Sequence, residues 1–220
     1  AYGNATLTLA WLTILGSVVT IGVDQTALRF LTRFIDEKNF SDISNFLSWG
    51  FRLIAKPIYV CCFAALIVFS LFLYVPINNL NAQWLSFLGM LLIATPMLGI
   101  TNCLTSILLA FRKTSRATFV QYLAFQLCLV IILMFCLAFK ISNIRESLIY
   151  EIFLLCLLIL MVMSVLFCKK LPINLKKSLR HKTIHNDNHS IWKQCAYRQA
   201  ASMLIYNLIV NLDFLLMGFY

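Results

Sequence analysis

The strongest constraint on this chain is a long stretch without a basic side chain. Lys56 and Arg112 bound the stretch, although the 220 residues include 18 Lys and Arg. A bilayer span needs roughly 20 apolar residues in a helix, so the stretch is long enough to cross a membrane twice around the polar turn 76–83. Six segments meet or approach that length: 5–23, 57–74, 84–111, 117–139, 147–168 and 199–220. The sequence therefore predicts an all-α polytopic membrane protein folded as a helical bundle.

Basic residues are distributed unevenly between the two sides of these segments. Three alternate connections hold 16 of the 18 Lys and Arg, whereas the opposite side holds only Lys140 and Arg145. Because Lys and Arg concentrate in short cytoplasmic loops, we expect Ala1 and Tyr220 outside and the basic connections in the cytoplasm. The net charge of +10 is then explained by the anionic inner leaflet of the bilayer, and no nucleic-acid partner is needed.

The basic segment 169–193 is the only stretch long and polar enough for an interdomain linker. It predicts an N-terminal transmembrane bundle over 1–168 and the first helix of a second lobe over 194–220. The first span starts almost at once and Tyr220 lies at the end of the last, so we expect an internal fragment.

The first basic connection carries local signals. The sequence 36–39 predicts a helix break and Ser41 predicts an N-cap. An interfacial helix should follow, with Phe46, Leu47 and Trp49 on it. Trp49, Trp84 and Trp192 all fall near expected membrane boundaries, where indole rings are enriched.

Cysteine and histidine spacing does not predict a metal site. The eight cysteines form no C-x-x-C pair and are expected to be reduced packing residues. His181, His185 and His189 are spaced by four and would align on a helix, but 186–188 is a poor helix sequence and no Cys or Glu completes a site. A solvated basic loop is the favoured interpretation.

Polar side chains form stripes on three spans. The first span carries Thr6, Thr13, Ser17, Thr20 and Asp24, and the third carries Thr95, Gly99, Asn102 and Ser106 near Pro96, where a kink is expected. Close helix packing and cavity lining both account for these two stripes. In the last span, Arg198, Ser202, Tyr206 and Asp213 share one face, opposite Asn207 and Asn211. Asp213 lies well inside the apolar segment and predicts a functional or buried partner, whereas Asp24 and Glu151 suit an interfacial position.

Two short motifs carry a family resemblance. The segment Gly22-Val23-Asp24-Gln25-Thr26-Ala27-Leu28-Arg29-Phe30 resembles the second helix of the O-antigen type polysaccharide-biosynthesis flippases. The segment Leu212-Asp213-Phe214-Leu215-Leu216-Met217-Gly218 is similar to their seventh helix. These flippases belong to the multidrug/oligosaccharidyl-lipid/polysaccharide exporter superfamily. The proline often found early in the seventh helix is missing here, since Arg198-Gln199-Ala200-Ala201 stands at that point.

The resemblance implies a two-lobed MATE-like transporter of which this chain covers about helices 2–7. It implies a flippase rather than an enzyme, in the bacterial cytoplasmic (inner) membrane, moving an undecaprenyl-pyrophosphate-linked oligosaccharide by alternating access. No cofactor is implied beyond coupling to Na⁺ or H⁺, and other polysaccharide-assembly membrane proteins are implied as partners. The candidate substrate-binding residues are Arg29, Arg198, Ser202 and Tyr206, and the candidates for ion coupling or cavity structure are Asp24 and Asp213.

Two other functions stay open at this stage. A multidrug exporter of the same superfamily would share the architecture and differ in cargo. A membrane-embedded glycosyltransferase or polymerase should offer clustered carboxylates or histidines and a large outer loop, whereas the expected outer loops are short.

Overall fold

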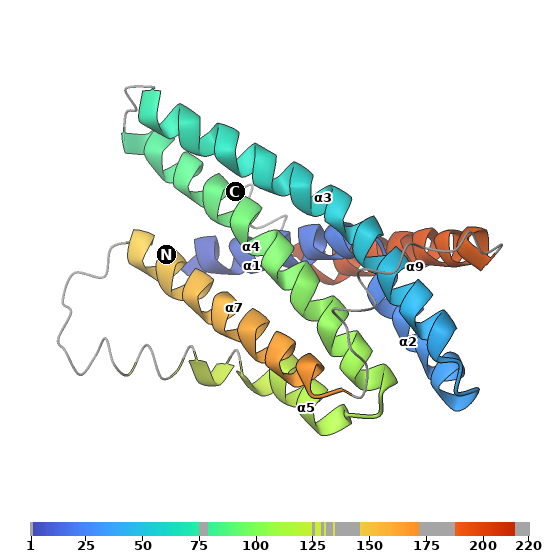
Figure 1. Cartoon of the computed structure of the whole chain (residues 1–220). Helices are drawn as coiled ribbons and strands as arrows, with labels where there is room; N and C mark the ends of the chain where they lie inside the picture. The colour runs from blue at the N-terminus through green and yellow to red at the C-terminus, as the bar shows by residue number, and fades with distance from the viewer. Residues whose placement is uncertain are drawn as a thin grey trace.

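The chain is described here by a computed structural model that covers residues 2–74, 79–124, 126–128, 130, 134, 146–171 and 188–213. Nearly all of these residues are helical, and no strand occurs among them. The helices are α1 (Tyr2–Thr20), α2 (Val23–Asp36), α3 (Phe40–Tyr74), α4 (Asn79–Ala110), α5 (Thr114–Thr118), the π-helix η1 (Phe119–Ala124), α7 (Glu146–Lys169) and α9 (Asn188–Val210). The predicted all-α class is confirmed (Figure 1).

Helix α4 is the centre of the bundle, because it contacts α1, α2, α3 and α7. Helices α3 and α4 form a long hairpin, and α7 packs on the other side of α4 (Figure 1). With 35 and 32 residues, α3 and α4 are about 52 and 48 Å long at 1.5 Å per residue. Both exceed the ~30 Å of a bilayer core, so part of each helix lies beyond it unless the helix is strongly tilted.

Three described helices are long and apolar enough to cross a membrane. Their apolar segments are Phe40–Ser70, Phe87–Ala110 and Glu151–Lys169, so the second, third and fifth expected spans are confirmed as long apolar helices. A fourth candidate is a pair bent by 50°, Ala10–Thr20 with Val23–Asp36. Ten of the 23 residues of the expected span 117–139, and the end of 199–220, lie outside the described residues.

The first expected span is interrupted, which corrects its end at residue 23. Helix α1 ends at Thr20, and the backbone turns through Ile21 and Gly22, which have φ angles of 47° and 68°. Gly22 favours this turn because it has no Cβ to oppose the left-handed conformation. Composition alone missed the break because apolar residues continue across it into Val23.

Helix α2 follows the break as an amphipathic helix. One face is buried against the bundle and carries Val23, Ala27, Leu31 and Phe34, while Arg29 and Arg33 are exposed on the other. Spacings of three and four residues place the apolar side chains on one side of a helix. Helix α2 therefore lies along α3, α4 and α9 and does not extend α1.

The expected break at 36–39 is confirmed, but the predicted cap is wrong. Helix α3 starts at Phe40, and the cap is Asn39: its Oδ1 accepts a 3.2 Å hydrogen bond from the Asp42 amide, and its Nδ2 donates to Asp42 Oδ2 at 2.8 Å. This reciprocal pair resembles a capping box, so Ser41 is not needed as a cap.

The expected interfacial helix leads directly into the next span, because α3 runs continuously through Pro57 to Tyr74. Phe46 and Leu47 on it are buried in the protein core. The sequence suggested a boundary because Arg52 and Lys56 separate this apolar patch from the next, although a helix continues through both patches.

Two of the basic connections meet at one end of the bundle. Arg112 Nη2, just after α4, donates to Asp36 Oδ1 at the end of α2 over 2.7 Å. Near them, the Arg116 guanidinium lies 5.9 Å from the ring of Phe167 in the last turns of α7. The start of the third basic connection therefore lies close to the second.

The last six residues of the expected interdomain linker 169–193 are helical. Helix α9 already begins at Asn188, so residues 188–193 are helical, and 172–187 lie outside the described residues. Helix α9 packs against α1 and α2, and the division into two lobes stays a prediction.

Candidate functional site at the α1–α2 break

Asp24, in the first turn of α2, is an acidic side chain that is buried beside the break. It is 8% exposed, and its Oδ1 has no hydrogen-bond partner within the described part of the chain. The simple interfacial position expected for Asp24 is therefore wrong. Glu151, for which the same position was expected, is exposed on α7.

The α2 N-terminus shapes the surroundings of Asp24. The Gly22 carbonyl accepts hydrogen bonds from the amide and the hydroxyl of Thr26, the former over 3.1 Å, and so closes the first turn. The Thr20 side chain lies next to the carboxyl group. Amide groups at a helix N-terminus stabilise negative charge, so this position suits a carboxylate despite its burial.

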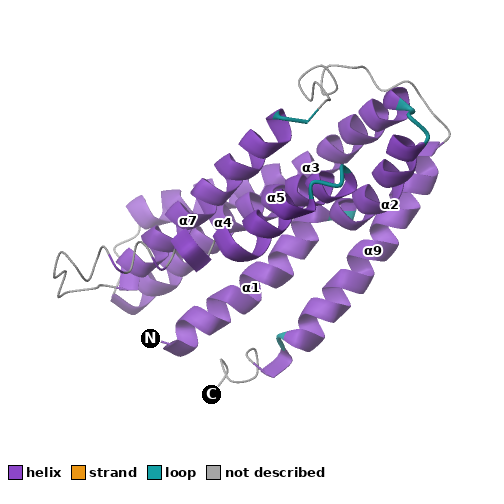
Figure 2. Cartoon of the chain, turned by 90° about the horizontal axis from the view of Figure 1, so that it is seen from below, coloured by secondary structure: helices purple, strands orange, loops and turns teal. Residues whose placement is uncertain are grey.

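Helix α9 closes directly over the break. A Cβ built on Gly22 would lie 2.3 Å from the Ala196 carbonyl oxygen and 2.6 Å from the Ala200 nitrogen. Farther along, Asn211 Nδ2 donates to Thr13 Oγ1 over 3.2 Å. The start of α9 therefore lies beside the end of α1, and the region after α9 lies beside Thr13, nearer the start of α1. The two helices run antiparallel, as Figure 2 shows.

Close packing accounts for most of the two polar stripes on α1 and α4. Ser17, Thr20, Thr95 and Ser106 are buried. The Ser17 hydroxyl donates to the Ile14 carbonyl at 2.7 Å, and the Thr20 hydroxyl donates to the Ser17 carbonyl at 3.0 Å. These hydroxyl groups are satisfied within their own helix, which lets the helices approach closely.

Glycine sets the distance between α1 and α4. A Cβ on Gly99 would lie 2.7 Å from Val19 Cγ1, and one on Gly16 would lie 2.6 Å from Leu98 Cδ2. Thr13 differs from its neighbours because it is exposed. The packing interpretation of the stripes is therefore favoured, with Thr13 as the exception.

An aromatic cluster holds the start of α9 against α2 and α3. Trp192 is 1% exposed, and its ring centroid lies 5.3 Å from Phe46, 5.8 Å from Trp49 and 6.2 Å from Phe34. The indole of Trp192 is therefore a core side chain that does not face lipid, and its expected position near a membrane boundary stays a prediction. The side chain of Trp84 lies outside the described residues.

The histidine series is only partly described. His189 packs near Trp192, with 5.2 Å between ring centroids, while His181 and His185 lie outside the described residues. Within the described ranges, no three His, Cys, Asp or Glu side chains are grouped to hold a metal ion. The seven described cysteines are free thiols, and Cys103, Cys156 and Cys168 are buried.

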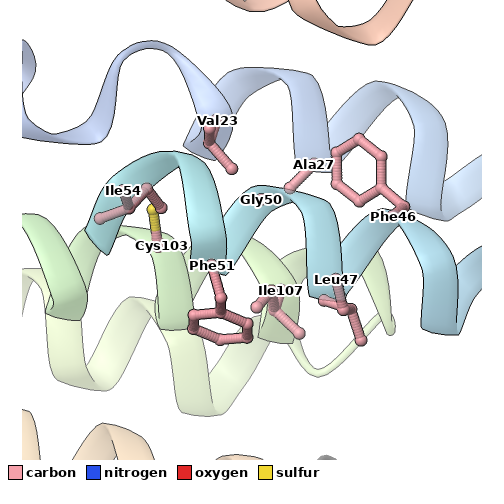
Figure 3. A pocket seen from close by; sticks show the side chains of 9 residues that line it. All are labelled: Val23, Ala27, Phe46, Leu47, Gly50, Phe51, Ile54, Cys103 and Ile107. Atoms are coloured by element: carbon pink, nitrogen blue, oxygen red, sulfur yellow. The ribbon is translucent and has the colours of Figure 1, made fainter. Parts of the chain in front are cut away.

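A small pocket lies next to the site, between α2, α3 and α4 (Figure 3). Its lining is apolar and includes Val23, Phe51, Ile54 and Cys103. None of the candidate site residues lines it. A pocket without polar groups cannot recognise a sugar or a phosphate, so we treat it as imperfect packing beside Asp24.

The other candidate residues lie on exposed surfaces. Arg29 is exposed on α2, and four candidates are exposed on or just after α9: Arg198, Ser202, Tyr206 and Asp213. Asn207 and Asn211 are partly buried, and Asn211 faces α1, where it contacts Thr13. The structure thus separates the exposed face of α9 from buried Asp24, and the roles of the exposed residues stay predictions.

Comparisons with protein-family models, curated proteins and solved structures found no match.

Proposed function

We propose that the protein is a flippase that moves a lipid-linked oligosaccharide across a membrane by alternating access, with a carboxyl group at a helix break as its coupling site. The observation that carries the proposal is buried Asp24 with one unpartnered oxygen at the α1–α2 break. Interrupted helices with an ionisable group at the break are a recurring construction in secondary transporters. The resemblance of residues 22–30 and 212–218 supplies the class of cargo, an undecaprenyl-pyrophosphate-linked oligosaccharide.

Asp24 suits the binding of a small cation. A buried ionised carboxylate is costly unless it is paired, so its open oxygen favours uptake of H⁺ or Na⁺. Uptake neutralises the charge two residues from Gly22, where α9 packs closely on the backbone. Ion binding at Asp24 would in this way favour one packing of α9 on the break over another.

The exposed face of α9 is the proposed contact for cargo. Arg198 and Arg29 are exposed and can form the paired hydrogen bonds that a diphosphate accepts. Ser202 and Tyr206 continue the face of Arg198 with hydroxyl groups suited to sugar. Asp213 lies farther along the chain and offers a second carboxylate.

A flip assay in proteoliposomes containing an undecaprenyl-pyrophosphate-linked oligosaccharide tests the proposal. Asp24→Asn keeps the size of the side chain and removes the titratable charge, so we expect near-normal abundance and at least a tenfold loss of flipping. The matched control is Glu151→Gln, which removes one negative charge from an exposed position and should keep normal activity. Full flipping by Asp24→Asn would remove the case for a coupling carboxyl.

Assays of drug resistance in cells and of glycan length in the proteoliposomes separate the alternatives. A multidrug exporter would confer drug resistance on cells without moving the lipid-linked sugar. A membrane-embedded glycosyltransferase or polymerase would change the length of the glycan, which gel analysis of the recovered lipid would show. A flippase moves the lipid without altering it.

A further inference from the structure

Helix α3 has an exposed face on which basic side chains give way to an apolar run. Arg52 and Lys56 are exposed one turn apart. Tyr59, Phe63 and Leu66 continue the face and are 73%, 66% and 66% exposed. At ~100° per residue, these five positions fall within about 80° of the helix circumference. We call them the α3 outer face.

This face lies at the edge of the bundle. Only 6% of the most apolar part of α3 is buried, compared with 50% for α4. Helix α3 runs along the opposite side of α4 from α7 (Figure 1). The large apolar side chains on the outer face are therefore available to lipid.

The positions of the charges match the dimensions of a bilayer. From Lys56 to Tyr74 the helix rises about 27 Å at 1.5 Å per residue, close to the ~30 Å hydrocarbon thickness. When this part of α3 crosses the membrane, Lys56 lies at its polar boundary and Arg52 one turn farther out. The sequence has no acidic residue between Asp42 and Glu146, so this length of α3 carries positive charge only.

We propose that the α3 outer face binds an acidic phospholipid, with its phosphate between Arg52 and Lys56 and its acyl chains along Tyr59, Phe63 and Leu66. The guanidinium can donate two parallel hydrogen bonds to phosphate, and the ammonium adds a point charge beside it. A zwitterionic lipid carries a cationic group next to its phosphate, so it gains less binding energy from Arg52 and Lys56. This site is independent of the flippase proposal, because it requires only a membrane.

Native mass spectrometry of the purified protein with phosphatidylglycerol or phosphatidylcholine tests the site. We expect saturable binding of phosphatidylglycerol and weaker binding of phosphatidylcholine. The double variant Arg52→Gln/Lys56→Gln should bind phosphatidylglycerol roughly 30-fold more weakly, about fivefold for each basic side chain near the membrane surface. The charge-preserving variant Arg52→Lys/Lys56→Arg should keep most of the binding.

The matched control removes two other exposed basic side chains. Arg33→Gln/Lys38→Gln lowers the net charge equally at the α2–α3 turn, away from the apolar run, and should bind phosphatidylglycerol like the native protein. Equal losses in both Gln double variants would reduce the effect to overall charge and overturn the site. Equal binding of the two lipids, or unchanged binding by Arg52→Gln/Lys56→Gln, would overturn it as well.

Discussion

The substitution Gly22→Ala tests whether α9 closes over the helix break as described. Alanine at a φ of 68° costs roughly 1–2 kcal/mol, because its Cβ opposes the left-handed conformation. The same Cβ would lie 2.3 Å from the Ala196 carbonyl oxygen and 2.6 Å from the Ala200 nitrogen, which are backbone atoms that cannot rotate away. Overpacking typically costs ~1–3 kcal/mol, so the total destabilisation is about 2–5 kcal/mol.

Two other glycines provide matched controls. Gly99→Ala places a Cβ 2.7 Å from Val19 Cγ1, but this neighbour is a side chain and the helix gains from alanine, so the net loss should be about 0–2 kcal/mol. Gly89→Ala meets only Val68 Cγ1 at 3.9 Å and should be neutral or stabilising by up to ~1 kcal/mol.

Thermal unfolding in detergent, followed by the fraction of monodisperse protein after heating, measures this series. We expect Gly22→Ala to unfold at the lowest temperature, then Gly99→Ala, with Gly89→Ala at or above the native protein. If Gly22→Ala unfolds together with Gly89→Ala, then the left-handed turn or the contact with α9 is wrong.

Three further predictions concern the cluster, the cap and the topology. Trp192→Ala should destabilise the protein by about 3–5 kcal/mol in the same unfolding assay, because it removes a fully buried indole, and Trp192→Phe should restore part of the loss. Asn39→Ala should cost about 1 kcal/mol of stability by removing the cap of α3, whereas an equal loss from Ser41→Ala would contradict the assignment. In a background without native cysteines, Asn78→Cys and Asn186→Cys should react with an impermeant thiol reagent from opposite sides of the membrane, and labelling of Asn186→Cys from outside intact cells would reverse the orientation.

The sequence predicted the long apolar helices well. A backbone that crosses lipid must satisfy its hydrogen bonds internally, so it forms a helix of about 20 apolar residues, which hydropathy detects. The segments 84–111 and 147–168 agree closely with α4 and α7. Their C-terminal ends are visible as basic pairs, Arg112–Lys113 and Lys169–Lys170, since a helix that leaves the bilayer needs polar side chains there.

The sequence was less informative where one helix is positioned by another. The break at Gly22 lies in a continuous apolar run and is stabilised by α9, more than 170 positions later. The residues on either side of Trp192 have the composition of a membrane boundary. Trp192 is a core residue because its ring contacts aromatic rings of α2 and α3. The Asn39–Asp42 pair was readable from the sequence, since an Asn three residues before an Asp fits a reciprocal cap.

The two aspartates show why depth in an apolar segment does not determine burial. Asp213 lies well inside its segment and is exposed on the described chain, while Asp24 lies at the end of its segment and is buried. The difference arises from the neighbouring helices: the break at Gly22 directs Asp24 into the bundle, whereas Asp213 follows α9, whose other face contacts α1 through Asn211. A buried carboxyl beside a backbone contact between two helices can couple its charge to their packing. An exposed carboxyl can do so only through a ligand or a partner surface, so Asp24 is the stronger candidate for ion coupling and Asp213 for contact with cargo.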